Sequence, residues 1–332
     1  MSDGRHTATG STVPGDQRLQ GVTAVVLTHM RPRLAGDAAR SLLEREGFAG
    51  SQIIVVVNGP GGLDDPELEA SVRMVRLPRN TGPAGGFRAG MVEAFADPAT
   101  QWVYLCEDDV GLFTLPCPRV AELLERLDVA DRSSPPVGAV VAYGRKFVGR
   151  GAHTVNVVPA EGGGPVLAPV DVACWGATLV SRCVVDSGVL PDPDWFFGLE
   201  DFDFFCRVRD AGFQVVVDGD AARSVAPEQT SAGREDAISS DRPTDADEAW
   251  RSYYHARNSI ELIRRHGDPT WYAWHLVYSL RHLQKARNRA SRIAILHGLL
   301  DGTRGRMGEN PRYARREGEF GPPSLAPLPP DR

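Results

Sequence analysis

Two clusters of acidic residues in this chain have the composition to hold a metal ion or to move a proton. The first is the triplet Glu107, Asp108 and Asp109, which follows the apolar run WVYL and Cys106. On an extended segment, residues two apart point to the same side, about 6.5 Å along the strand. Glu107 and Asp109 can therefore converge on one ion while Asp108 points away. Carboxylate oxygens suit Mg²⁺ or Mn²⁺, and an acidic loop that caps the next helix is the alternative.

The second cluster is Glu200, Asp201 and Asp203, within the segment WFFGLEDFDFF. We predict that a helix starts here, and negative charge at a helix start is favoured by the helix dipole, which is a purely structural explanation. The six aromatic residues of the segment, however, surround the acids with apolar surface, and such surroundings raise the pKa of a carboxyl group. A carboxylate that titrates nearer neutrality is suited to take a proton from a hydroxyl group.

Three further segments carry residues that could bind a ligand. GPAGGF at 82–87 combines glycines, which permit close backbone approach, with a helix start whose free N–H groups attract anions. A tight strand-to-helix turn explains that segment equally well. Arg31 and Arg88 could give charge-assisted hydrogen bonds to a diphosphate, and Arg31 is favoured because it follows the first predicted strand. Trp175, beside Gly176, could stack on a sugar face or lie in the core.

Short apolar runs alternate with helix-length segments along the chain. The predicted strands are 22–27, 52–57, 72–77, 101–106, 137–143 and 213–218, and the predicted helices are 34–47, 84–96, 249–266 and 268–300. Asp268 is the expected N-cap of the last helix, with Pro269 at its first position. The alternation predicts the α/β fold class, with a mostly parallel sheet covered by helices on both faces. Such sheets bind ligands beyond the carboxyl ends of their strands, which is where the first acidic cluster falls.

Composition limits the partners and the compartment. A formal net charge of −6 gives no basic field, so nucleic acid is not expected as a partner. No two of the five cysteines form a C-x-x-C pair, which indicates free thiols in a reducing cytoplasm. The first twenty residues lack the apolar core of a signal peptide, and no stretch holds eighteen uninterrupted apolar residues. A cytoplasmic protein that does not span a membrane is therefore expected.

Seven motifs occur in an order that resembles the family 2 glycosyltransferases of the GT-A fold, including bacterial rhamnosyltransferase- and galactofuranosyltransferase-like members. The motifs are VVLTHMRP (25–32), IIVVVNGPG (53–61), RNTGPAGGFRAG (79–90), YLCEDDV (104–110), ACWGATLVSR (173–182), WFFGLEDFDFFCRVRDAG (195–212) and YYHARNSIELI (253–263). The resemblance covers roughly residues 21–300 of the chain.

The resemblance implies an inverting glycosyltransferase and gives roles to the residues that match its motifs. Asp201 would be the catalytic base. Acceptor binding would involve Trp175, Gly176, Glu200 and Asp203, nucleotide-sugar binding would involve Thr28, Arg31, Asn58, Arg88 and Asp108, and Glu107 and Asp109 would hold Mg²⁺ or Mn²⁺. Val57 stands where the family usually has an Asp before Asn58, so recognition of the nucleotide base is expected to differ.

The resemblance also implies partners and domains. The donor would be a nucleoside diphosphate sugar, with rhamnosyl or galactofuranosyl transfer expected, and the acceptor a saccharide or polyprenyl-linked saccharide of cell-envelope polysaccharide synthesis. The expected domains are a disordered tail at 1–20, a catalytic domain at 21–227, an acidic linker or mobile loop at 228–248, C-terminal helices at 249–309 and a Pro-rich tail at 310–332. Within the catalytic domain, 21–136 would bind the nucleotide sugar and 137–227 the acceptor.

Several alternatives stay open. An NAD enzyme is disfavoured because no G-x-G-x-x-G follows the first strand, but a non-catalytic sugar-nucleotide-binding module, or a glycosyltransferase with a small soluble acceptor, would share the pattern. The segment 271–289 mixes aromatic and basic residues, which is typical of a helix at a membrane interface. A helix packed on the catalytic domain with a solvated basic face explains it as well. The expected location is therefore cytoplasmic, with peripheral contact to the inner face of the plasma membrane as an open alternative.

Overall fold

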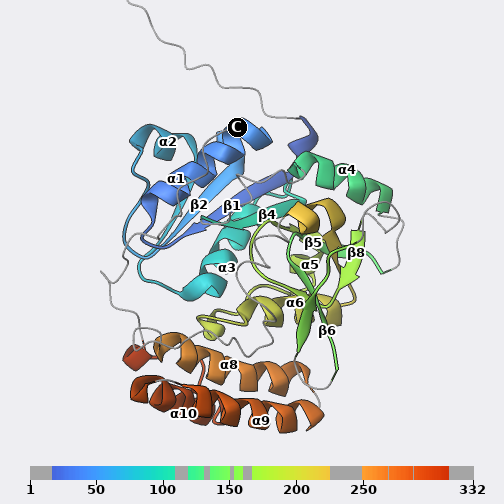
Figure 1. The fold of residues 1–332 in the computed structure, drawn as a ribbon. Coiled ribbons are helices and arrows are strands. Elements are labelled where there is room, and N and C mark those ends of the chain that lie inside the picture. The colour runs from blue at the N-terminus through green and yellow to red at the C-terminus, as the bar shows by residue number, and fades with distance from the viewer. Residues whose placement is uncertain are drawn as a thin grey trace, which may run out of the picture.

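The computed structural model describes residues 17–108, 119–130, 135–149, 153–159, 167–224, 249–267, 269–286 and 288–313. Its strands are β1 (Val22–Thr28), β2 (Ile53–Asn58), β3 (Arg73–Leu77), β4 (Trp102–Glu107), β5 (Val137–Val141), β6 (Gly144–Phe147), β7 (Thr154–Asn156), β8 (Leu167–Val170), β9 (Val172–Ala173), β10 (Thr178–Ser181) and β11 (Gln214–Asp218). Eight of them form one sheet in the order β3-β2-β1-β4-β10-β5-β11-β8, and β7, β6 and β9 form a small second sheet (Figure 1).

Helices cover both faces of the large sheet. The α-helices that the structure describes are α1 (Pro32–Ser41), α2 (Pro66–Ser71), α3 (Gly82–Phe95), α4 (Val120–Ala130), α5 (Arg182–Asp186), α6 (Glu200–Asp210), α8 (Ala249–His266), α9 (Pro269–Lys285) and α10 (Arg289–Thr303), of which the last three lie together beyond the sheet (Figure 1). Alternate residues of β1 enter opposite cores: Ala24 belongs to the core that contains α1 and α4, whereas Val25 belongs to the core that contains α3 and α6. Because both faces are covered, β1 and β2 are buried along their whole length.

The expected mostly parallel sheet flanked by helices is confirmed, with two antiparallel strands, β10 in its middle and β8 at one end of the strand order. β3, β2, β1 and β4 are parallel neighbours, and β5 is parallel to β11. Between these groups lies β10, which runs antiparallel to both β4 and β5. We did not predict β10, β8 or β9, because they are short and lack the long apolar runs of the other central strands.

The C-terminal helices differ from the expectation at one point. We predicted a single helix over 268–300, and this is wrong, because α9 ends at Lys285 and α10 begins at Arg289. Asn288 between them has extended backbone, and its side chain accepts a hydrogen bond of 2.7 Å from the Ser291 N–H. This is an N-cap, which starts a new helix. Pro269 is confirmed as the first residue of α9, and Asp268 lies outside the described residues.

The described chain extends past both predicted tail boundaries. Leu19, within the short helical turn Gln17–Leu19, is fully buried in the core. Near the other end, Tyr313 stacks on Tyr253 of α8 with ring centroids 4.2 Å apart. The predicted linker at 228–248, residues 1–16 and residues 314–332 lie outside the described residues, so the domain boundaries stay a prediction. Among the helices that the structure describes, none is long and apolar enough to cross a membrane.

The glycines of the segment 82–90 allow α3 to lie close to its neighbours. A Cβ atom at Gly86 would lie 2.3 Å from the Leu27 side chain, and one at Gly90 would lie 2.4 Å from the Val25 side chain. Gly82 has a φ of +72°, and a Cβ there would lie 1.7 Å from the carbonyl oxygen of Phe196. Packing of α3 on β1, and on the loop that precedes α6, therefore accounts for these glycines.

We expect Gly82→Ala to lower the free energy of unfolding much more than Gly149→Ala. Gly149 has a similar φ of +67°, and a Cβ there would meet nothing within 4 Å, so its substitution should cost only the left-handed strain of about 1–2 kcal/mol. Gly82→Ala adds the clash with the Phe196 carbonyl, which should cost about 1–3 kcal/mol more. Urea unfolding of both variants measures the difference, and equal losses would show that the contact with the Phe196 loop does not constrain this position.

Candidate active site

The carboxyl ends of β1 and β4 meet at one edge of the sheet, where Leu27 pairs with Glu107 and Thr28 lies beside Asp108. Asp108, which follows β4, turns into the protein. Its carboxylate accepts a hydrogen bond of 2.6 Å from the Thr28 hydroxyl group and forms an ion pair with Arg31. Three residues that we predicted to contact the nucleotide sugar are thus joined to one another.

Asn58, at the end of β2, holds the loop that begins α3. Its amide nitrogen donates to the Asn80 side-chain oxygen at 3.2 Å and to the Gly82 carbonyl oxygen at 2.9 Å. Its amide oxygen accepts hydrogen bonds from the N–H and hydroxyl groups of Thr81 at 2.8 and 2.9 Å. Both amide protons and both oxygen lone pairs are therefore used inside the protein. Asn58 shapes this edge of the sheet, and its predicted contact with a nucleotide stays a prediction.

Arg88 and Gly176 lie on the chain segments around this edge. Arg88 is exposed on α3, and its guanidinium donates a hydrogen bond of 3.2 Å to the carbonyl oxygen of Pro191. Gly176 precedes β10 and has a φ of +120°, a conformation that side-chain-bearing residues rarely adopt. Arg88 thus joins α3 to the segment before α6. Gly176 permits the backbone turn that precedes β10.

Trp175 is 6% exposed and belongs to an aromatic cluster. Its ring centroid lies 4.9 Å from that of Phe87, 5.3 Å from that of Phe204 and 5.7 Å from that of Phe205. Of the two interpretations that its sequence left open, this burial favours the core residue over a platform for a sugar ring.

Glu107, Glu200 and Asp201 form the electrostatic centre of the candidate site. Burial raises the pKa of Glu200 well above its usual value, and the negative charges of Asp201 and Glu107 raise it further. Burial also raises the pKa of Asp201 to about 6, although hydrogen bonds from the backbone of Phe202 and of Trp175 oppose the shift. The two acidic clusters of the sequence are therefore close enough to act on each other. Asp201 is partly exposed, whereas Glu200 beside it is buried.

Asp203 lies on the same helix but has the opposite environment. Its carboxylate is fully buried and contacts Arg207 at 2.8 Å, His266 at 3.0 Å and Arg265 at 3.4 Å. Burial opposes ionisation of this carboxyl group, but the hydrogen bond from His266 and the two arginine charges outweigh burial and lower the pKa of Asp203. Asp203 is therefore part of an ion-pair network that joins α6 to α8.

The loop before α6 is held by two buried residues of α8. The Asn258 side-chain nitrogen donates to the carbonyl oxygens of Phe197 at 2.8 Å and of Gly198 at 2.6 Å. The Arg257 guanidinium donates to the carbonyl oxygen of Trp195 at 2.7 Å. Arg257 and Asn258 are both fully buried, so these bonds are shielded from water. We call this arrangement the Arg257–Asn258 clamp.

The clamped loop has a strained backbone. Phe196 and Leu199 have φ values of +60° and +63°, in the left-handed region that residues other than glycine rarely occupy. Leu199 directly precedes α6, so this conformation sets the direction in which Glu200 and Asp201 enter the helix. Backbone strain of this kind persists only where surrounding contacts fix it, and the Arg257–Asn258 clamp supplies those contacts.

Two residues near Asp201 were absent from our sequence interpretation. The positive charge of Arg145, on β6, opposes the effect of burial on the pKa of Asp201. Burial, reinforced by the charge of Asp201, raises the pKa of Cys174 to about 12, so Cys174 stays a neutral thiol. The sequence around Arg145 gave no signal, because its proximity to Asp201 comes from tertiary structure. For Cys174, the one available signal was that it directly precedes Trp175 in the sequence.

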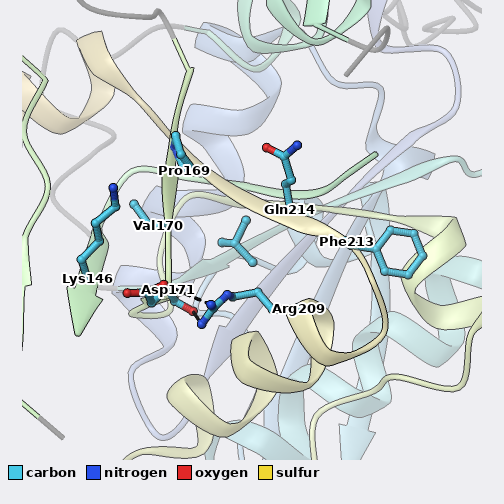
Figure 2. Close-up of a pocket in the computed structure, with 8 residues that line it drawn as sticks. Lys146, Pro169, Val170, Asp171, Arg209, Phe213 and Gln214 are labelled. Atoms are coloured by element: carbon cyan, nitrogen blue, oxygen red, sulfur yellow. Dashed lines mark hydrogen bonds and ion pairs between the residues drawn. The ribbon is translucent and has the colours of Figure 1, made fainter. Parts of the chain in front are cut away.

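A shallow pocket of about 270 Å³ lies elsewhere, at the opposite end of α6 (Figure 2). It is lined by Lys146, Pro169, Val170, Asp171, Arg209, Phe213, Gln214 and Val215. Asp171 and Arg209 are 3.2 Å apart and form an ion pair, as the dashed lines in Figure 2 indicate. The pocket contains none of the predicted site residues, and its paired charges give no reason to place the chemistry there.

Of the two predicted metal ligands, the structure describes Glu107, whereas Asp109 lies outside the described residues. Within the described ranges, no group of three or more His, Cys, Asp or Glu side chains is arranged to hold a metal ion. Glu107 ends β4, and its charge raises the pKa of Glu200 after the larger effects of burial and Asp201. Its carboxylate is a hard oxygen donor in an acidic setting, so Glu107 fits Mg²⁺ or Mn²⁺ as one ligand.

Comparison with known proteins does not assign a family. No family model matches the chain, and no curated protein matches it. Among solved structures, the chain is similar to one described as the crystal structure of A197 from STIV, at 12% sequence identity and a TM-score of 0.33, over 59% of this chain and 80% of that chain. A likeness this distant carries no functional argument, so any functional conclusion rests on the site itself.

The opposite environments of Asp201 and Asp203 predict opposite effects of their amide variants on stability. The pKa of Asp201 is raised from 3.8 to about 6 on folding, so the ionised form opposes folding and stability falls as the pH rises through this range. At pH 7.5 the Asp201→Asn variant should therefore be more stable than wild type, by about 1–3 kcal/mol in the free energy of unfolding. Urea unfolding measures this difference. The gain should disappear near pH 4.

Asp203→Asn is the matched control, because the pKa of Asp203 is lowered on folding. Its ionised form stabilises the fold above its unfolded pKa, and that contribution is lost as the pH falls through the folded pKa. Asp203→Asn should therefore be less stable than wild type at pH 7.5, with a smaller loss in acid. Shifts of the same sign in both variants would contradict the assigned environments.

Proposed function

We propose that this protein is an inverting glycosyltransferase that moves a sugar from a nucleoside diphosphate sugar to a hydroxyl group, with Asp201 as general base. The observation that carries the proposal is that the charges of Asp201, at the start of α6, and of Glu107, at the end of β4, both raise the pKa of Glu200, so the two acidic clusters meet at one place. The mostly parallel sheet is compatible with the GT-A fold that the seven sequence motifs resemble.

Asp201 meets two requirements of a general base. The residue is partly exposed, and a pKa of about 6 leaves its carboxylate ionised at neutral pH and still able to accept a proton. Asp201 would take the proton of the acceptor hydroxyl group as that oxygen attacks the anomeric carbon. The bond between this carbon and the phosphate oxygen breaks, and its electron pair leaves with the nucleoside diphosphate. One displacement inverts the configuration, without a covalent enzyme intermediate.

The neighbouring acids would have different tasks. Burial and the charges of Asp201 and Glu107 raise the pKa of Glu200, so Glu200 would favour its protonated form and could donate a hydrogen bond to the acceptor. Asp203 is committed to Arg207, Arg265 and His266, and we therefore assign it to the support of α6 in place of acceptor binding.

The donor would lie at the edge formed by β1, β2 and β4. Asp108 holds Arg31 there, and the Arg31 side chain is 29% exposed, so its guanidinium can also reach a diphosphate. We propose Glu107 and Asp109 as ligands of Mg²⁺ or Mn²⁺, which when bound supplies positive charge against the leaving diphosphate. Rhamnosyl or galactofuranosyl transfer to a glycan or polyprenyl-linked saccharide rests on the sequence resemblance.

Asp201→Asn should lower kcat for sugar transfer by about 10²–10⁴-fold, the usual effect of removing a general base. The amide keeps the shape of the side chain but cannot accept the proton, so donor affinity should survive. Turnover would be followed as release of nucleoside diphosphate from dTDP-, UDP- and GDP-sugars. The wild-type rate should also fall below a pH of about 6, the pKa of Asp201, and this acidic limb should be absent from the variant.

Asp194→Asn is the matched control, because Asp194 is an exposed carboxylate on the turn that leads into the same loop. Its turnover should equal that of wild type. Near wild-type turnover in Asp201→Asn would remove Asp201 as the base. Release of nucleoside diphosphate by neither wild type nor control, with donor binding retained, would instead indicate a non-catalytic binding module.

Metal dependence gives a separate test of Glu107. EDTA should abolish transfer, and added Mg²⁺ or Mn²⁺ should restore it. Glu107→Gln should raise the metal concentration that gives half-maximal turnover, because an amide oxygen is a weaker ligand than a carboxylate. Asp108→Asn should instead lower the melting temperature, since its carboxylate is buried against Thr28 and Arg31. Full activity in EDTA would show that transfer needs no divalent ion.

A further inference from the structure

The inner side of helix α9 mixes the polar residues His275 and Ser279 with the apolar residue Leu283, whereas its outer side carries several exposed apolar side chains. On the inner side, Ser279 is buried and lies 3.2 Å from the His275 ring nitrogen. On the outer side, Tyr272, Leu276 and Leu280 are 43%, 62% and 53% exposed. Residues four apart line up along one side of a helix, so these three form a continuous apolar ridge. A surface helix of a globular protein normally has charged or polar residues on its outer side.

The inner side of α9 is a true protein interior. Burial, together with the neighbouring charges of His255 and His282, lowers the pKa of His275 to about 4. The rings of His255, on α8, and His282 lie 6.4 Å apart. Neutral imidazoles can be buried at this contact between α8 and α9, so the orientation of α9 has favourable partners and the ridge faces away from the protein.

Positive charge borders the ridge. From residue 269 to residue 303 the sequence has five Lys or Arg residues and one acid, Asp301, although the whole chain has a formal net charge of −6. Arg281 and Lys285 of α9 and Arg289 of α10 are exposed. A symmetric contact with a second copy of the chain would bring these like charges together. An anionic lipid surface matches both the apolar ridge and the positive charge.

We propose that the α9 ridge of Tyr272, Leu276 and Leu280, together with the adjacent exposed Val277, docks on an anionic lipid bilayer. The helix would lie in the plane of the interface, with its apolar side chains among the upper acyl chains and Arg281 and Lys285 near lipid phosphates. Trp274, which is 36% exposed, has the amphipathic ring that favours this depth. Lipid docking goes beyond the proposed function and does not depend on it.

The position of α8 would connect this surface to the candidate site. α8 lies between the sheet domain and the two last helices (Figure 1). One side of α8 carries the Arg257–Asn258 clamp on the loop before α6, and another side contacts α9. In a protein docked through α9, the neighbouring helix α8 would therefore connect the docking surface to the loop that precedes Asp201.

The test is co-sedimentation of the full chain with lipid vesicles. Vesicles of phosphatidylcholine with about one-third phosphatidylglycerol are compared with vesicles of phosphatidylcholine alone, at low salt. We expect binding to the anionic vesicles only, with a decrease on addition of salt. Leu276→Gln/Leu280→Gln should reduce the partition coefficient at least about tenfold, because two apolar contacts are lost. Arg281→Gln/Lys285→Gln should reduce it about fivefold per charge.

Val92→Gln is the matched control, because Val92 is a 52% exposed apolar residue on α3, away from α9. It should bind vesicles as wild type does. All replaced residues are exposed, and melting temperatures should confirm that the variants fold. Protein that stays in the supernatant at low salt, or a Leu276→Gln/Leu280→Gln variant that binds like Val92→Gln, would overturn the proposal. A dimer in light scattering that Leu276→Gln/Leu280→Gln dissociates would assign the ridge to a second copy and overturn it too.

Discussion

The Arg257–Asn258 clamp is the contact on which the candidate site depends. A buried guanidinium needs hydrogen-bond acceptors to replace water, and Arg257 finds them in carbonyl oxygens of Trp195 and Gly308. The ring centroids of Tyr253 and Tyr254 lie 5.7 and 4.8 Å from its charge, which adds cation–π attraction. The strained backbone before α6 is therefore fixed by the interior of the C-terminal helices.

The loop before α6 sets the start of that helix, where two acids that are close in sequence have different environments. Asp201 and Asp203 lie two residues apart at the start of α6, and therefore point to different sides of the helix. Burial near Glu200 raises the pKa of Asp201, whereas Arg207, Arg265 and His266 outweigh burial and lower that of Asp203. One acid is thereby prepared to exchange a proton, and the other anchors the helix that carries it.

A similar division holds at the carboxyl ends of the strands. Polar residues that look like ligands in the sequence bond mainly to one another: Thr28 and Arg31 to Asp108, and Asn58 to the loop at 80–82. Such a network costs less when every polar group has a partner, and it gives the edge a defined shape. The charge of Glu107 raises the pKa of Glu200 on α6, so the negative charge of the site comes from both halves of the chain.

The sequence by itself determined the elements whose signal is local. The apolar runs that became β1, β2, β4, β5 and β11, and the two acidic clusters that end β4 and begin α6, could be found because strand burial and helix starts depend on adjacent residues. Tertiary structure decided what depends on residues distant in sequence. It placed β10 antiparallel in the middle of the sheet, buried Trp175, brought Arg145 toward Asp201 and turned the apolar side of α9 outward. Periodicity shows that a helix has two different sides, but only the packing partners decide which side faces the protein.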